Sequence, residues 1–153
     1  MARYYFDSSA LAKLYQSEIG SERVQTIFRE SNRRIIISRL TVAEMHSVFA
    51  RRVRMGDLTA ADAGALRTRL LNDIATTALT VLAVTDRHYA ETERLLMQYG
   101  NTKRLRTLDA MQLAVALDVH RVVALDSIVA ADNALCEVAA EEGLATENPG
   151  TAI

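Results

Sequence analysis

The sequence predicts an α/β fold in which helices cover both faces of a central, mostly parallel sheet of four to five strands. Short apolar runs rich in β-branched and aromatic residues alternate along the 153-residue chain with longer segments of helical spacing. Strands that alternate with helices favour a parallel sheet, because each connection lays a helix on a sheet face. Half of the residues are hydrophobic, which is enough to form a core. We therefore expect one domain over residues 1–153 with three layers.

The first half of the chain contains two strands and a long helical stretch. Residues 3–6 are β-prone, and the capping residues after them begin short helices that extend to about residue 30. The isoleucine run within 34–38 is a second buried strand. A helix over 42–54 stops at Gly56, and a helix over 60–75 follows it as a hairpin. The apolar positions of 60–75 would cover the core or contact a second copy of the chain.

The second half repeats the alternation with shorter strands. Each apolar run is again followed by a segment of helical periodicity, and turn residues separate the two. The predicted elements are strand 79–84, helix 87–99, helix 108–119, strand 127–131, helix 134–142 and a short final strand at 145–147.

Four acidic residues occupy the ends of predicted strands or the first turns of predicted helices. Asp7 ends the first strand, and Asp132 ends strand 127–131. Glu44 and Asp109 lie in the first turns of helices. Because strand ends and helix starts gather at one rim of an open α/β sheet, these distant acids are expected to meet in one cleft.

Each of these acids alone has a structural explanation. Thr41 and Glu44 match a capping box, Asp109 follows a possible cap at Thr107, and the other two are candidate N-caps. Capping does not explain why all four fall on the same predicted rim. Carboxylates that meet there repel one another strongly, and Mg²⁺ or Mn²⁺, which prefer oxygen ligands, would relieve the repulsion. The joint pattern therefore indicates a metal-dependent enzyme.

The segments around these acids resemble the PIN domain, and more narrowly the small VapC-type toxins of bacterial toxin–antitoxin pairs. The resemblance rests on residues 6–15, 40–44, 105–114 and 129–135, with 142–144 and 148–149, which occur in the family's order over nearly the whole chain. It implies a Mg²⁺- or Mn²⁺-dependent endoribonuclease that is usually a homodimer and is held inactive by a cognate antitoxin protein.

The expected chemistry is metal-assisted hydrolysis of an RNA phosphodiester. The metal would be held by Asp7, Asp109 and Asp132, with Glu44 binding directly or through water, and would lower the pKa of a bound water. Asp126 competes with Asp132 for the last position. We choose Asp132 because strand 127–131 ends at it, whereas Asp126 precedes that strand and should point to the opposite rim.

A net charge of −1 argues against a nucleic-acid substrate, although the basic residues are clustered. Lys103, Arg104 and Arg106 directly precede an acid of the predicted site, and Ser8 follows another, so these four are candidate phosphate contacts. The other basic cluster within a helix is expected to be an ordinary solvated face. Its members are Arg51, Arg52 and Arg54.

Other classes of protein fit the sequence less well. The single cysteine, Cys136, excludes a disulfide framework, and no apolar run is long enough for a membrane helix, so we expect a cytoplasmic protein. A PIN-fold module that acts only through a partner remains an alternative. A phosphotransferase or receiver with Asp7 as nucleophile is another, but Ser9 replaces its usual second acid and Lys13 lies inside a helix.

Overall fold

The sheet consists of five parallel strands in the order β3-β2-β1-β4-β5. A computed structural model describes residues 1–151. The strands are β1 (Ala2–Phe6), β2 (Arg33–Ser38), β3 (Thr80–Leu82), β4 (Ser127–Val129) and β5 (Thr146–Glu147). The helices are α1 (Ser8–Tyr15), α2 (Ser21–Arg29), α3 (Arg39–Arg54), α4 (Ala60–Ala75), α5 (Asp86–Tyr99), α6 (Thr107–Val122) and α7 (Asn133–Glu141).

The strand order reverses beside β1. From β1 the chain adds β2 and β3 on one side, then returns to place β4 and β5 on the other. In register, Tyr5 of β1 lies between Ile36 of β2 and Ile128 of β4. A switch point of this kind leaves a crevice beyond the carboxyl ends of the strands, which is where open α/β sheets bind ligands. Here the crevice is beyond β1 and β4.

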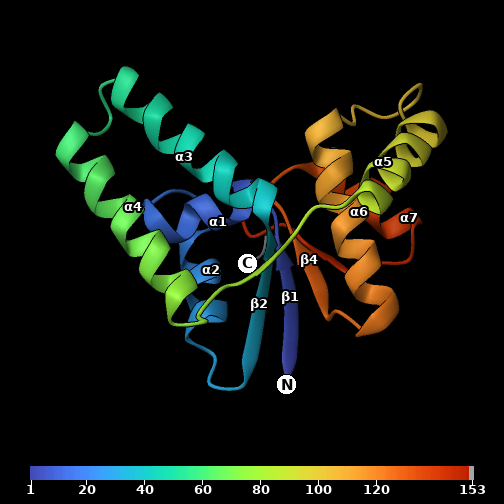
Figure 1. Cartoon of the computed structure of the whole chain (residues 1–153), viewed down its shortest axis with the longest axis horizontal. Coiled ribbons are helices and arrows are strands. Elements are labelled where there is room, and N and C mark those ends of the chain that lie inside the picture. The colour runs from blue at the N-terminus through green and yellow to red at the C-terminus, as the bar shows by residue number, and fades with distance from the viewer. Residues whose placement is uncertain (152–153) are drawn as a thin grey trace.

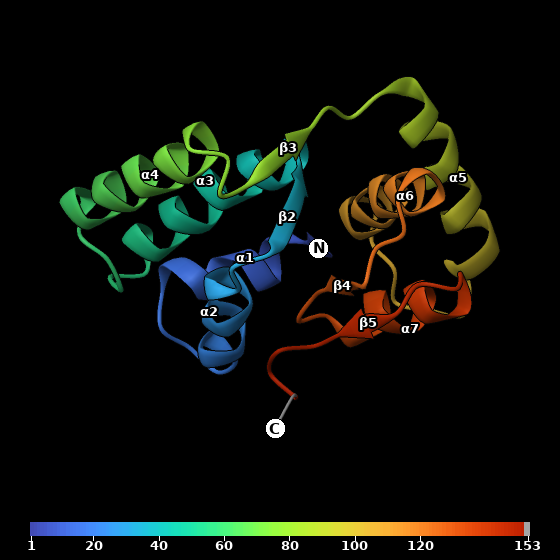
Figure 2. The same ribbon diagram turned by 90° about the horizontal axis from the view of Figure 1, so that it is seen from below.

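Alternating side chains of the sheet pack into two separate apolar cores, one on each face. Phe6 and Ile37 face the core formed with α1, α2, α3 and α4. Tyr5, Ile36 and Ile128 face the core formed with α5, α6 and α7. Because successive strand residues point to opposite faces, β1, β2 and β4 supply side chains to both cores. The three predicted layers are confirmed, and Figures 1 and 2 show the two groups of helices on either side of the sheet.

Most predicted elements are confirmed with small shifts at their ends. The helix predicted over 60–75 has those bounds, and its Ala63 and Leu70 are fully buried, so its apolar side covers the core. It packs beside α3 as the predicted hairpin. The strands predicted over 79–84 and 127–131 are each only three residues long, because the chain turns away from the sheet before the apolar run ends.

The predicted start of α3 is wrong. The helix begins at Arg39, and the Ser38 side chain caps it by accepting a hydrogen bond from the Thr41 amide. The capping box between Thr41 and Glu44 therefore does not exist, and Glu44 lies in the second turn. Helix α6 also begins one residue early, at Thr107, so Thr107 is not its cap. Capping thus gives no reason for an acid at position 44.

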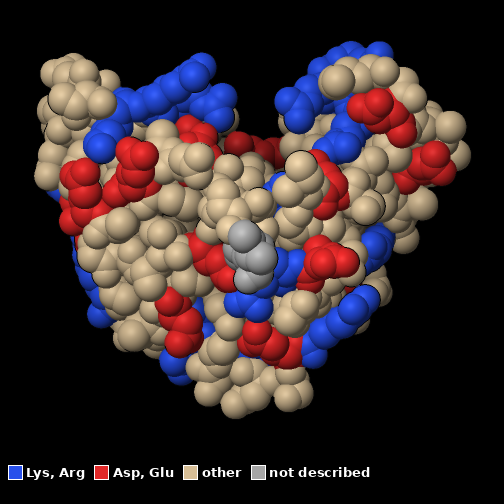
Figure 3. Space-filling view, turned by 180° about the vertical axis from the view of Figure 1, so that it is seen from behind, with Lys and Arg blue, Asp and Glu red and all other residues tan. Residues whose placement is uncertain are grey.

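The helices project beyond the carboxyl ends of the strands as two lobes, one made by α3 and α4 and the other by α5 and α6 (Figure 1). In the space-filling view the surface is hollowed between these lobes (Figure 3). Acidic side chains lie deep in the hollow, and Lys and Arg side chains cover both of its rims. In residues 1–151 no helix is long and apolar enough to cross a membrane.

Candidate active site

Asp7 lies at the base of the crevice, directly after β1. Its Oδ1 accepts a hydrogen bond from the Ala10 amide at 3.0 Å and caps α1. The Ser9 hydroxyl donates to the same carboxylate at 2.7 Å and accepts from the Ala131 amide at 2.9 Å. Ser9 therefore ties Asp7 to the segment that follows β4. With 4% of its surface exposed, Asp7 is a buried carboxylate without a cationic partner among residues 1–151.

Asp132 follows β4 as Asp7 follows β1. Its Oδ1 caps α7 by accepting from the Leu135 amide at 3.0 Å, and its Oδ2 is 4.0 Å from the Arg106 guanidinium. One carboxylate oxygen is thus structural, and the other is presented to the crevice. Asp126 lies at the other end of β4, where its Oδ2 accepts from the Arg3 amide at 2.7 Å. The two aspartates are therefore at opposite rims of the sheet.

Glu44 and Asp109 reach the crevice from opposite layers. Glu44 projects from α3, and Asp109 lies in the first turn of α6. Gln112, one turn after Asp109, donates to Glu44 Oε1 at 2.7 Å. The structure thus brings the four acids selected from the sequence to one rim: two from strand ends and one from each helical layer.

Burial and neighbouring charges raise the pKa of Asp7 and of Glu44. Burial raises the pKa of Asp7 to about 7, and the charges of Glu44 and Asp109 add to this effect, while hydrogen bonds from Ser9 and Ala10 oppose it. The pKa of Glu44 is also raised, first by burial and further by the charge of Asp109. Bringing these carboxylates together therefore costs free energy in the absence of a cation.

Arg106 is the protein's own cation at this rim. Its Nε donates to Asp109 Oδ2 at 3.1 Å, and its guanidinium extends toward Asp132. The side chain is 76% exposed, so it can move away at little cost. As the side chains lie, no three His, Cys, Asp or Glu residues within 1–151 converge closely enough to hold a metal ion. The acids are neighbours, and Arg106 lies between two of them.

Gln112 is the residue that sequence analysis missed. It is buried, and its Oε1 lies within hydrogen-bond distance of three hydroxyl groups, on Tyr5, Ser38 and Thr41. Its Nε2 orients Glu44. The signal in the sequence was a polar residue inside the apolar run of α6, three positions after Asp109, where a core side chain would be expected.

We expect Gln112→Met to destabilise the protein by about 1–3 kcal/mol, because the buried Tyr5 hydroxyl loses its acceptor. Urea unfolding measures the change. Tyr5→Phe removes that hydroxyl, so the double variant Tyr5→Phe/Gln112→Met should be less destabilised than the two single changes summed. Additive effects would show that the two side chains are not coupled.

The four residues predicted to contact phosphate lie in different surroundings. Lys103 is paired with Glu137 and Glu141 of α7, so its charge is already neutralised. Arg104 lines a hollow that also contains Arg106 and Asp132, beside the acids. Ser8 approaches Glu44, and its hydroxyl favours the charged form of that carboxylate by lowering its pKa.

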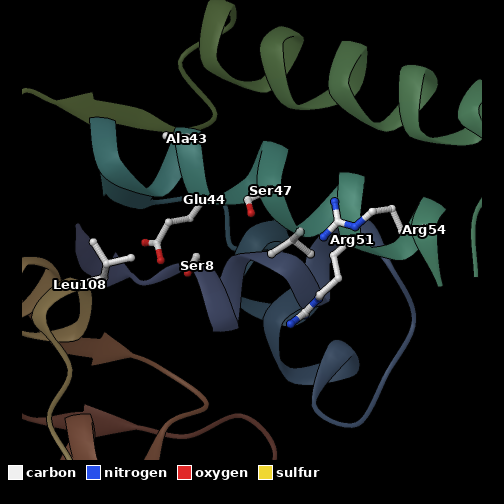
Figure 4. Close-up of a pocket in the computed structure, with 8 residues that line it drawn as sticks. Ser8, Ala43, Glu44, Ser47, Arg51, Arg54 and Leu108 are labelled. Atoms are coloured by element: carbon white, nitrogen blue, oxygen red, sulfur yellow. The ribbon is translucent and has the colours of Figure 1, made fainter.

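The arginines of α3 do not share one environment. Arg51 and Arg54 are exposed, as expected of a solvated face, and both also line the groove that contains Glu44 (Figure 4). Arg52 points elsewhere and pairs with Glu18.

Cys136 and Lys13 are the side chains that test a covalent mechanism, either at the thiol or at a phosphorylated Asp7. Burial raises the pKa of the Cys136 thiol to about 11, with Asp7 and Asp132 adding to the effect, so the thiol is not a nucleophile at neutral pH. Lys13 donates to the Ile19 carbonyl at 2.7 Å, which directs its ammonium group to the loop after α1. A phosphotransferase that uses Asp7 would thus lack the lysine it needs.

The family model for the PIN domain matches residues 4–141. The chain belongs to the PIN domain family. The match begins in β1 and ends with α7, so it includes all four acids of the crevice. No curated protein sequence matches the chain.

Solved structures share this PIN fold over most of the chain. VapC20 of Mycobacterium tuberculosis, described as a sarcin-ricin loop cleaving toxin, is 17% identical, with a TM-score of 0.66 over 92% of this chain and 95% of that one. FitAcB of Neisseria gonorrhoeae is 18% identical, with a TM-score of 0.67 over 97% and 99% of the two chains. VapBC2 of Rickettsia felis, bound to a fragment of promoter DNA, is 14% identical, with a TM-score of 0.62 over 95% and 98%.

Proposed function

We propose that this PIN protein is a metal-dependent endoribonuclease and the toxin of a toxin–antitoxin pair. The observation that carries the proposal is the crevice at the switch point, where the buried Asp7 lies near Glu44 and Asp109. Burial and the charges of these two acids raise the pKa of Asp7. Acids gathered at a cost in stability are typical of functional sites. The similarity to a toxin that cleaves the sarcin-ricin loop supports RNA as the substrate.

The donor set fits Mg²⁺ or Mn²⁺. All four candidate ligands are carboxylates, and none of the three histidines belongs to the group, which favours a hard cation over zinc. Because the side chains do not close around one point, we propose that water supplies part of the coordination, as is usual for Mg²⁺. Asp7, Asp109 and Asp132 would bind the ion, with Glu44 binding directly or through water.

A bound ion would lower the pKa of a water and neutralise charge on the phosphate that is attacked. The protein orients three of the four carboxylates through hydrogen bonds. Ser9 holds Asp7 by a hydrogen bond, Gln112 holds Glu44, and the helix cap of α7 holds Asp132. Arg106 would leave Asp109 and contact a non-bridging phosphate oxygen, as its exposure allows.

Cleavage of a mixed single-stranded RNA by the purified chain, with Mg²⁺ or Mn²⁺ and with EDTA, tests the proposal. We expect internal cuts with metal and none with EDTA. Equal cleavage under both conditions would exclude a metal-dependent site, and no cleavage under either would favour a module that acts only through a partner.

We also expect Mg²⁺ or Mn²⁺ to raise the melting temperature. A ligand that binds only the folded state adds about 2.7 kcal/mol at 100 times its Kd, or roughly 5–10 °C for a chain of this size. Differential scanning fluorimetry with a metal titration measures the shift. Asp126→Asn is the matched control and should shift as the wild type does, because Asp126 lies at the opposite rim. An unchanged melting temperature at millimolar metal would contradict the proposed metal site.

The partner is proposed to be a small antitoxin protein encoded beside this chain. The similarity to a toxin–antitoxin complex from Klebsiella pneumoniae supports this. Homodimerisation remains a prediction from the family resemblance. Sedimentation of the purified protein would test it.

A further inference from the structure

A groove runs away from the acids along one face of α3. Its walls come mainly from α3, with one residue from α1 and one from α6, and Figure 4 shows it from the side. The lining residues are Ser8, Ala43, Glu44, Ser47, Val48, Arg51, Arg54 and Leu108. The α3 members recur every three or four positions, so they share one helix face. An acid of the site and two arginines are therefore part of the same surface.

The two arginines of this groove are free to bind a ligand. Both are exposed, and neither makes an ion pair with a carboxylate of residues 1–151. Arg52, which lies between them in sequence, is paired with Glu18. The helix dipole favours arginine anywhere in the last turn of α3, but it does not explain why the two unpaired ones share a face with Glu44.

The spacing along α3 places the arginines beyond the reaction centre. At a rise of about 1.5 Å per residue, Arg51 is about 10 Å and Arg54 about 15 Å along the helix axis from Glu44. Their backbone positions therefore lie further along the groove than the acids. Both can touch phosphates further along the same strand.

We propose that the α3 groove is the path of the RNA strand on one side of the cleavage position, with Arg51 and Arg54 each contacting one backbone phosphate. This inference rests on the proposed ribonuclease function. The net charge of −1 argued against a nucleic-acid substrate. Arginines beside the acidic centre would supply the local positive charge that an RNA backbone needs to bind there. Figure 3 shows such cations on both rims of the hollow.

The lining also indicates how the strand is recognised. No aromatic side chain lines the groove, so bases have no surface on which to stack. Apart from Glu44, the other wall residues are small or aliphatic, and the arginine forks match phosphate oxygens. The groove is therefore expected to hold the backbone and to contribute affinity without sequence preference.

The test is the salt dependence of RNA binding by Arg51→Gln/Arg54→Gln. All variants carry Asp7→Asn to prevent cleavage, and a fluorescent RNA of about 12 nucleotides is titrated in Mg²⁺ by anisotropy. Each phosphate contact on a single strand contributes about 0.7 to the slope of log K against log salt, so the double variant should lose about 1.4 and each single variant about 0.7. The loss should be the same for RNAs of different sequence.

The matched control is Arg29→Gln/Arg34→Gln. These arginines are also exposed and unpaired within residues 1–151, but they lie at the end of α2 and the start of β2, at the opposite rim of the sheet. The control removes the same charge and should leave the slope unchanged. Equal melting temperatures of the two double variants would show that both are folded.

Three outcomes are distinguishable. A smaller slope only in the α3 variant supports the groove. Equal slopes in the α3 variant and the control would overturn the proposed RNA path. The proposed function would still stand in that case if the wild type cleaved RNA with metal. If no variant binds RNA and the wild type does not cleave it, the groove and the proposed function both fail.

Discussion

Asp7→Asn is expected to abolish RNA cleavage and, at the same time, to stabilise the metal-free protein. Loss of even an outer partner of a metal ligand lowers activity by about 10–100-fold, so loss of a direct ligand should cost at least about a hundredfold. The fold should persist, because asparagine can still cap α1 by accepting from the Ala10 amide. Gel-based cleavage rates with Mg²⁺ measure the loss of activity.

The gain in stability follows from the raised pKa of Asp7. Its pKa is about 7 in the folded protein against a model value of 3.8, so between these values the folded state binds more protons than the unfolded state. Stability therefore falls as pH rises through this window, and a raised pKa costs about 1.4 kcal/mol for each unit. Asparagine does not titrate. The advantage of the variant should be small near pH 4, grow up to about pH 7 and then remain constant.

Urea unfolding of both proteins in EDTA at several pH values between 4 and 8 measures this difference. Mg²⁺ should reduce this advantage above pH 7, because it stabilises only the wild type, whose Asp7 is intact. A variant that is less stable than the wild type at every pH would indicate that Asp7 is a structural cap and no more.

Asp132→Asn should lose metal affinity and nuclease activity together. The substitution keeps the cap of α7, since asparagine caps as well as aspartate, and removes only the charge of the oxygen that faces the crevice. The loss should again be at least about a hundredfold. Calorimetric titration with Mn²⁺ and cleavage rates are the measurements.

Asp126→Asn is the counterpart of this variant. Its carboxylate accepts from the Arg3 amide at the opposite rim, so metal affinity and activity should stay within about twofold of the wild type. If Asp126→Asn lost metal affinity and Asp132→Asn did not, the choice between the two aspartates would be reversed.

The sequence was sufficient for the layers and for the rim at which the acids meet. Strand periodicity and the residue that ends each strand are local properties, so Asp7 and Asp132 could be placed from them. The beginning of α3 was not predictable in the same way. Ser38 belongs by composition to the strand, and its role as a cap depends on the turn that follows β2. The sequence therefore placed Glu44 in the crevice correctly, but the capping box that it suggested for Glu44 does not form.

Gln112 and the arginines of α3 could not be assigned from the sequence for another reason. Gln112 contacts residues of β1, β2 and α3, and these contacts exist only when the two helical layers meet. Arg51 and Arg52 are adjacent and chemically identical in the sequence. One reaches the groove and the other pairs with Glu18, which depends on the rotation of α3 on the sheet.

The two apolar cores of this protein are separated by the sheet and share no side chain, and Gln112 spans them above the sheet rim. It belongs to α6 and donates a hydrogen bond to Glu44 of α3, so one amide group joins the two helical layers directly. An ion bound by Asp109 of α6 and Glu44 of α3 would join the same two layers a second time. Metal binding, and with it catalysis, would then require both helical layers to be in place. A transient movement of either layer away from the sheet would separate Glu44 from Asp109.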